Sequence, residues 1–313
     1  MTSMTQNLTQ RVILIAGPTA SGKSGFALRL AEEIGGTVIN ADSMQVHREL
    51  SIITAPPTAD EMARVPHKLY GFVAGAEAYS VGRYLEDAAR AIAETRAEGR
   101  VPIVVGGTGL YFKALLEGLS PLPLIDPEIR ARLRARAEEE GAAALHAELA
   151  RCDPDSALRL MPTDKQRVVR ALEVLESTGR TLGEWQKLPG TPVVRESEAV
   201  RLLLVADRET LMAKIDRRFD AMLAAGVLDE IRTFMPLGLS EELPAVRAHG
   251  VRPLMAYLRG DISLETAAEG SKAETRQYAK RQLTWHRRNM IAWKIIKTQQ
   301  MEQSNAIGVA FSA

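Results

Sequence analysis

One segment of the chain has the residue types and the spacing of a phosphate-binding loop. It reads GPTASGKS and fits the pattern G-x-x-x-x-G-K-[ST], with a strand-like run before it and helical apolar spacing after it. Glycines let the backbone N–H groups face phosphate oxygens, the lysine neutralises a phosphate, and the last hydroxyl can ligate Mg²⁺. We therefore predict phosphate binding, with Mg²⁺ on Ser24, at Gly17, Pro18, Thr19, Ala20, Ser21, Gly22, Lys23 and Ser24.

The acid that accompanies this loop should indicate the chemistry. The apolar run 101–105 ends in glycines and offers no carboxylate, and Asp207 after a later run suits a surface turn equally well. Asp42 lies just past the strand expected at 37–41, where sheets of this type gather ligand-binding groups. It could act there as a base or cap a helix, and the spacing leaves both roles open.

A second glycine-rich turn follows the run 101–105. It reads GGTGLYFKALL from Gly106 to Leu116 and would bring Thr108 and backbone N–H groups towards the same anion. A tight turn without a ligand is the alternative. Two such turns in one sheet favour the binding role.

The elements around these turns predict an α/β fold, with a P-loop NTPase-like parallel sheet flanked by helices. Strands are expected at 11–16, 37–41, 101–105 and 200–206, with a long helix at 81–98. Between them lies a charged, Ala- and Arg-rich stretch without strand character, which we interpret as an all-helical insertion. The predicted domains are a discontinuous core at 1–121 and 199–300, an insertion at 122–198 and a fraying tail at 301–313.

The composition is that of an ordinary folded protein, with 46% hydrophobic and 25% charged residues among 313. No signal-like start or long apolar run is present and Cys152 is the single cysteine, so we expect a cytoplasmic chain without disulfides. Charge is uneven: residues 272–298 carry +7 while the whole chain carries +1, which leaves −6 for the rest. A polyanion-binding face is one explanation, and a solvated helix is the other.

Several motifs in order carry a family resemblance: GPTASGKS, ADSMQV, GGTGLYFKALL, QRVVRALEV and TRQYAKRQLTW. With these motifs the chain resembles the tRNA dimethylallyltransferases over nearly its whole length. The resemblance implies that the loop holds dimethylallyl diphosphate and that the acceptor is the amine of the adenosine at tRNA position 37. It further implies the use of Mg²⁺, with Asp42 as the base, Thr108 on the leaving oxygen, and Lys23 on the diphosphate. We separately expect a monomer, because the sequence shows no strong interface signal.

The same resemblance implies a tRNA-binding set. We expect its members at Asp42, Ser43, Met44, Gln45, Arg130, Gln166, Arg167, Val168, Val169, Arg170, Arg276, Lys280 and Arg281. Gln45 has both a donor and an acceptor for an adenine edge. Trp285 in the basic segment suits a core position better than a stacking platform.

Three alternatives remain at this point. A small-molecule P-loop kinase would need only the loop and the sheet, but it would not explain the basic segment or QRVVRALEV. A nucleotide-gated RNA-binding module would not need Asp42. A free-nucleotide prenyltransferase would not need the insertion.

Overall fold

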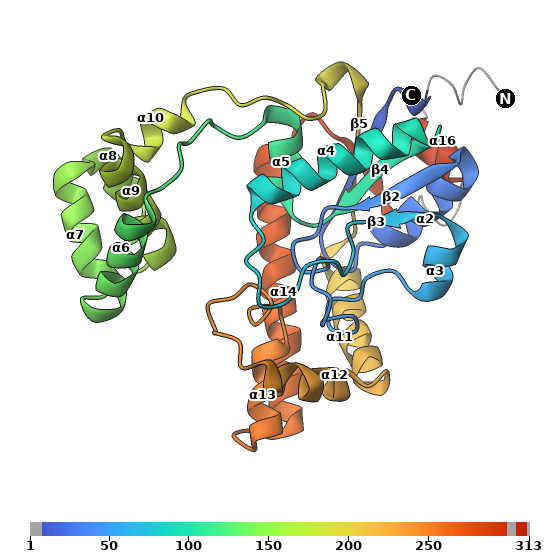
Figure 1. Ribbon diagram of the computed structural model, residues 1–313. Helices are drawn as coiled ribbons and strands as arrows, with labels where there is room; N and C mark the ends of the chain where they lie inside the picture. The colour runs from blue at the N-terminus through green and yellow to red at the C-terminus, as the bar shows by residue number, and fades with distance from the viewer. Residues whose placement is uncertain (1–7, 299–304, 312–313) are drawn as a thin grey trace. The chain divides into compact units, whose positions relative to one another are not determined.

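A parallel β-sheet organises the larger of two units in the computed structural model, which describes residues 8–298 and 305–311 (Figure 1). Within those residues the sheet has six strands in the order β3-β2-β4-β1-β5-β6, and every neighbouring pair is parallel. The strands are β1 (Val12–Ala16), β2 (Gly36–Asn40), β3 (His67–Lys68), β4 (Val101–Gly106), β5 (Ala199–Val205) and β6 (Lys294–Lys297).

Successive side chains along a strand point to opposite faces of the sheet, and both faces are apolar because most residues of the central strands are apolar. Ile13 and Ile15 of β1 pack with α2 (Lys23–Ile34) and α16 (Ala306–Phe311), whereas Leu14 packs on the opposite face with α4 (Val81–Ala97) and α5 (Gly109–Glu117). Glu33 of α2 accepts hydrogen bonds from the backbone N–H groups of Ala306 and Ile307, at 3.0 and 2.9 Å. The sheet is therefore covered by helices on both of its faces.

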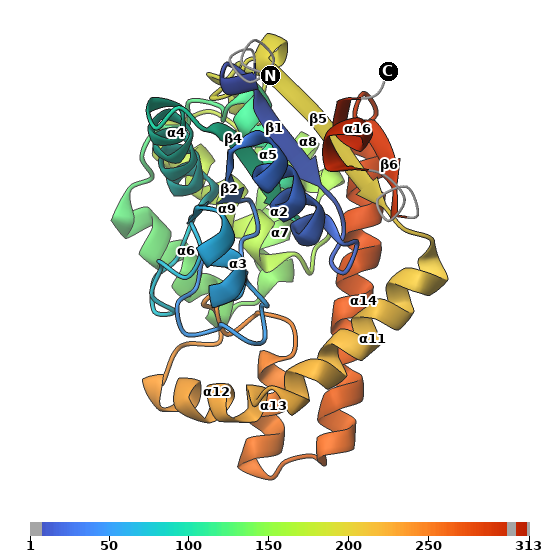
Figure 2. The same ribbon diagram turned by 90° about the vertical axis from the view of Figure 1, so that its right-hand side faces the viewer.

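A helical group extends from the edge of this sheet (Figure 2). It comprises α11 (Arg208–Ala224), α12 (Val227–Phe234), α13 (Val251–Arg259) and α14 (Leu264–Asn289), while a short α3 (Ala59–Arg64) precedes β3. Phe219, Ile231 and Leu254 are buried in one cluster that joins these helices to Leu50 and Ile53 from the loop after β2. The long α14 thus links the helical group to the strand ends.

The second unit spans Glu117–Pro192 and is built from helices. They are α6 (Pro127–Glu139), α7 (Ala142–Cys152), α8 (Pro154–Arg159), α9 (Lys165–Thr178) and α10 (Leu182–Gln186). Leu133, Leu145, Val168 and Leu172 are almost fully buried in its own core. The unit begins five residues before the predicted insertion boundary at 122 and ends six before the predicted 198.

The predicted fold class is confirmed: a parallel sheet lies between helices, as a P-loop-like fold requires. Sequence patterns missed β3, which has only two residues, and β6, which lies inside the basic segment. The expected fraying tail is wrong for residues 305–311, because they contain α16; the rest of the predicted tail, 301–304 and 312–313, lies outside the described residues. In the described part of the chain, none of the helices is long and apolar enough to span a membrane.

Candidate active site

The phosphate-binding loop has the backbone conformation that its glycines predict. Gly22 caps α2 with φ of 82°, and Ala20 also has a positive φ of 62°. A β-carbon on Gly17 would stand 2.7 Å from Oγ of Ser21, so the loop closes tightly. The predicted anion site therefore sits between β1 and the N-terminus of α2, where the helix dipole favours negative charge.

Lys23 supplies a cation whose proton is weakly held. Its Nζ donates to the carbonyl of Pro18 at 3.2 Å, within its own loop. Burial lowers the pKa of Lys23 to about 8, the charge of Asp42 acts against this shift, and Arg218 adds to it. A bound anion would remove this penalty by giving the ammonium a partner.

Asp42 is held by the end of β2. Asn40, fully buried, accepts from the backbone N–H of Asp42 at 2.8 Å and donates to its carbonyl at 2.9 Å. Oδ1 of Asp42 accepts from the N–H of Met44 at 3.0 Å, which closes a turn, and no helix begins there. The N-cap alternative for Asp42 is therefore wrong, and the carboxylate lies at the wall of a pocket.

The second glycine-rich turn lies beside Asp42, since β4 pairs with β2. A β-carbon on Gly106 would stand 2.0 Å from the carbonyl oxygen of Ala41, so only glycine fits. The hydroxyl of Thr108 accepts from the N–H of Ser43 at 2.9 Å and lies 3.3 Å from Oγ of Ser43. Thr108 thus lies beside the residue that follows Asp42, and its hydroxyl proton, in a long bond to Ser43, can turn to a better acceptor.

One face of α14 completes the site, and sequence analysis missed it. Gln282, only 5% exposed, accepts from the N–H of Thr19 at 2.9 Å and donates to the carbonyl of Gly107 at 2.9 Å. Tyr278, one turn earlier, hydrogen-bonds with Thr108 and Gln282; burial raises its pKa, and the charge of Asp42 adds to the rise. Gln282 therefore ties the phosphate loop to the second glycine-rich turn.

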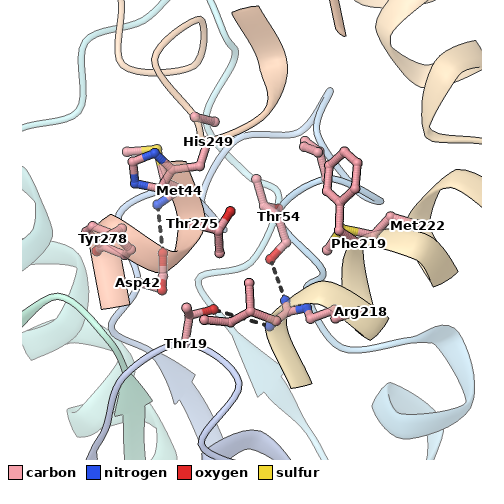
Figure 3. Close-up of a pocket in the computed structure, with 13 residues that line it drawn as sticks. Thr19, Asp42, Met44, Thr54, Arg218, Phe219, Met222, His249, Thr275 and Tyr278 are labelled. Atoms are coloured by element: carbon pink, nitrogen blue, oxygen red, sulfur yellow. Dashed lines mark hydrogen bonds between the residues drawn. The ribbon is translucent and has the colours of Figure 1, made fainter. Parts of the chain in front are cut away.

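Arg218 of α11 is a further cation that the sequence did not single out. Its guanidinium donates to Oγ1 of Thr19 at 3.4 Å and to the carbonyl of Thr54 at 3.3 Å, which are long contacts with neutral oxygens (Figure 3). Among the described residues no carboxylate lies within ion-pair distance of Arg218. Its charge is thus available to an anion bound at the neighbouring loop.

One pocket brings Asp42, Thr19 and Arg218 together with apolar side chains (Figure 3). It encloses about 630 Å³, its open mouth included. Its polar lining residues also include Thr54, His249, Thr275 and Tyr278. The remaining lining residues include the apolar side chains of Met44, Ile53, Ile215, Phe219, Met222 and Ala248.

In the loop after Asp42, hydrogen bonds within the protein occupy part of the groups that were predicted to contact the acceptor base. Nε2 of Gln45 donates to the carbonyls of Thr54 and Ala55 at 3.0 and 2.8 Å, so its amide donor holds the chain. The expectation that Gln45 offers both donor and acceptor to a base therefore needs correction, because only Oε1 remains. Ser43 is bonded to Thr108, and Met44 lines the pocket.

Part of the predicted tRNA set lies on the helical unit. Arg130 is on α6, while Gln166, Arg167 and Arg170 are on the surface of α9. Val168 and Val169 are 0% and 6% exposed and belong to that unit's core. Their side chains pack rather than face a ligand, so a contact role is retained for the polar residues of this segment alone.

The basic C-terminal segment divides into two parts. Arg276 pairs with Asp216 of α11 at 2.7 Å, so its expected place on an RNA face is corrected to a helix-packing role. Lys294 and Lys297 lie on β6, beyond the end of α14. A groove on α14 retains Lys280 and Arg281 and is lined by Gln277, Lys280, Arg281, Thr284, Trp285 and Arg288.

A bound metal ion would take few of its coordinating atoms from the protein and most of them from the bound diphosphate and water. In the described residues no group of three or more His, Cys, Asp or Glu side chains is placed to hold one. Mg²⁺ often takes one or two protein ligands and fills its shell with phosphate oxygens and water. The exposed Ser24 in the first turn of α2 fits that limited role.

Comparison with known proteins gives consistent matches. Residues 45–289 match the family model described as IPP transferase, and residues 10–70 match one described as isopentenyl transferase. A tRNA dimethylallyltransferase of Parvibaculum lavamentivorans is 52% identical, covering 96% of this chain and 95% of its own.

Solved structures agree. A full-length tRNA isopentenylpyrophosphate transferase from Bacillus halodurans has a TM-score of 0.67 at 34% identity, covering 94% of each chain. A eukaryotic dimethylallyltransferase acting on tRNA has a TM-score of 0.78 at 29% identity, covering 96% of this chain and 76% of its own.

Proposed function

The chain belongs to the IPP transferase family, and we propose that it transfers the dimethylallyl group of dimethylallyl diphosphate to the exocyclic N6 amine of the adenosine at tRNA position 37. The family resemblance predicted from the motifs is confirmed. The kinase alternative is not favoured, because relatives across nearly the full length are tRNA dimethylallyltransferases. One observation supports the proposal above others: Asp42 shares a pocket with Thr19 of the phosphate loop and with an apolar wall.

The donor is assigned to the phosphate loop and its neighbours. The loop amides, Lys23 and Arg218 would bind the diphosphate, and the apolar wall from Ile215 to Met222 would receive the five-carbon group. Mg²⁺ on Ser24 and the phosphate oxygens would add charge neutralisation when bound. A P-loop that lies beside an apolar wall suits a prenyl diphosphate better than a nucleotide.

The reaction needs a base and a stabilised leaving group. The adenine N6 attacks C1 of the dimethylallyl group, the C1–O bond breaks with its electrons going to the diphosphate, and Asp42 takes the N6 proton. Thr108 turns its hydroxyl from Ser43 to the oxygen that leaves. Lys23 and Arg218 hold the negative charge that grows there, in a site already arranged for it.

The acceptor must leave its stack in the RNA to reach this pocket. Neutral groups lie where its edge would arrive: the ring of His249 is 4.6 Å from that of Tyr278, and burial lowers its pKa. The groove with Lys280 and Arg281 continues along α14 from Tyr278, since Arg281 lies 5.7 Å above that ring. Phosphates of the tRNA are the ligands that such a groove fits.

Transfer of label from radiolabelled dimethylallyl diphosphate to unmodified tRNA tests the proposal. Asp42→Asn keeps an acceptor for the Met44 N–H but removes the base, so we expect the chemical step to slow about 10²- to 10⁴-fold. Excess ATP should leave the wild-type rate unchanged. Absence of label in the tRNA together with consumption of ATP would contradict the proposal and indicate a kinase.

A further inference from the structure

The helical unit contains a carboxylate surrounded by an excess of positive charge. Glu173 of α9 is only 4% exposed, and acids are rarely buried so deeply without partners. Three guanidinium groups approach it: Arg130 at 3.8 Å, Arg134 at 3.7 Å and Arg170 at 3.4 Å. We call these four residues the Glu173 cluster.

The cluster follows from helix geometry. Arg130 and Arg134 are four residues apart on α6, and Arg170 and Glu173 are three apart on α9, so each pair shares a helix face. The apolar sides of both helices pack in the core with Leu133 and Leu172. That packing fixes the distance over which one carboxylate can reach arginines from both helices.

The charge balance sets this cluster apart from the other ion pairs of the unit. Elsewhere within the described residues Glu117–Pro192, each cation that forms an ion pair has at least one acid of its own, as in Arg132–Glu176, Lys165–Glu138, Arg167–Asp164 and Arg136 with Glu140 and Glu148. In the cluster three cations share one acid, which leaves +2. The Nε of Arg130 is buried and has no hydrogen-bond partner in the described part of the chain.

The contacts are loose and the arginine heads are accessible. Arg130, Arg134 and Arg170 are 43%, 69% and 37% exposed, while the carboxylate is 5% exposed. Each guanidinium has five N–H donors in a planar fork, so most of them are left for an outside acceptor. Phosphate oxygens match that fork and supply the charge that would neutralise the excess.

We propose that Glu173 is a positioning residue: its buried carboxylate gathers Arg130 and Arg170, which belong to the expected tRNA-binding set, together with Arg134, so that all three can bind phosphates of the tRNA. The proposal rests on the proposed function, because it takes its polyanion to be the tRNA substrate. Glu173 touches no substrate in this view. Its buried charge keeps the three guanidinium groups close together before the RNA arrives.

The two explanations of Glu173 predict opposite results for Glu173→Gln. If net charge alone mattered, removing an acid would tighten tRNA binding. If Glu173 positions the arginines, KM for tRNA should rise about tenfold at moderate salt, and the slope of log K against log salt should shrink by about one for each phosphate that is no longer bound. kcat at saturating tRNA and KM for the donor should stay unchanged.

Glu176→Gln is the matched control, because Glu176 lies one turn further along α9 and pairs with Arg132 alone. It should not raise KM for tRNA. Arg134→Ala provides a second test if Glu173→Gln misfolds. Removal of this exposed side chain should lower the slope of log K against log salt by about one, whereas Arg132→Ala should leave the slope unchanged.

Unchanged or tighter tRNA binding by Glu173→Gln would overturn the proposal, as would an unchanged salt slope for Arg134→Ala. Failure of the proposed function looks different, since the wild-type enzyme would then place no label in tRNA at all.

Discussion

Gly109, at the first position of α5, faces the indole of Trp285 so closely that a β-carbon would stand 2.2 Å from Cε3 of the ring. The rigid ring cannot yield as a flexible side chain could. Trp285 therefore serves as a packing surface against α5 as well as a wall of the basic groove.

Gly109→Ala should destabilise the fold because α14 must shift away from α5. We expect a loss of about 1–3 kcal/mol in the free energy of unfolding, measured by urea denaturation. Gly82→Ala in α4 is the control: its β-carbon would meet Oγ of Ser80 at an ordinary 3.6 Å. Equal stabilities of the two variants would contradict the close approach.

Gln282→Ala should weaken donor binding and stability together. The change leaves the N–H of Thr19 and the carbonyl of Gly107 without their partner, at a cost of about 1–3 kcal/mol for each buried group. KM for dimethylallyl diphosphate should rise, because the phosphate loop is no longer hydrogen-bonded through Gln282 to the second glycine-rich turn. Gln277→Ala, at an exposed position of the same helix, should change neither quantity.

Arg218→Ala should raise KM for the donor with little loss of stability. Its two hydrogen bonds in the ligand-free protein are long and go to neutral oxygens, whereas a charge-assisted bond to diphosphate contributes about 1.5–3 kcal/mol. We expect a tenfold to hundredfold effect, on the order given by that range. Arg217→Ala, the exposed neighbour, should match the wild type, and a comparable rise there would point to general electrostatics.

Donor binding should weaken above pH 8. Burial lowers the pKa of Lys23 to about 8, so the ligand-free enzyme loses this proton as pH rises through that value. KM for the donor should stay flat below pH 8 and climb by up to about tenfold per pH unit above it. Lys23→Arg keeps its charge throughout, so its profile should remain flat whatever its absolute KM.

The same shift has a consequence for folding. Above pH 8 the folded lysine is neutral while the unfolded lysine remains protonated up to about 10.5, so the unfolded chain binds more protons. The contribution of Lys23 therefore makes the ligand-free protein more stable as pH rises between these two values. Denaturation of wild type and Lys23→Met across this window measures it, and parallel curves would contradict the shift.

The contiguous parts of the site were predictable from sequence. The phosphate loop and the turn after β4 are recognisable from their glycines, because each of these positions needs either a positive φ or a backbone without a β-carbon. Asp42 was predictable for a related reason: a residue just past a strand in a parallel sheet lies at the ligand-binding edge.

The remaining parts depend on tertiary packing. Arg218 and Arg217 are adjacent in a charged helix, and only the position of α11 against Thr19 tells them apart. Gln282 left a weaker signal, since Thr275, Tyr278 and Gln282 lie on one helical face with polar groups directed at the site. β6 has four residues with charged ends, so its pattern merged with the basic helix before it.

Gln282 and Thr19 are 263 residues apart in the chain, yet they meet in one hydrogen bond at the phosphate loop. Protein synthesis adds about 5–20 residues per second, so Thr19 is made roughly 13–53 s before its partner exists. Throughout that interval the loop has its sequence but lacks the support of α14. The proposed diphosphate site therefore gains this support only after α14 has been synthesised.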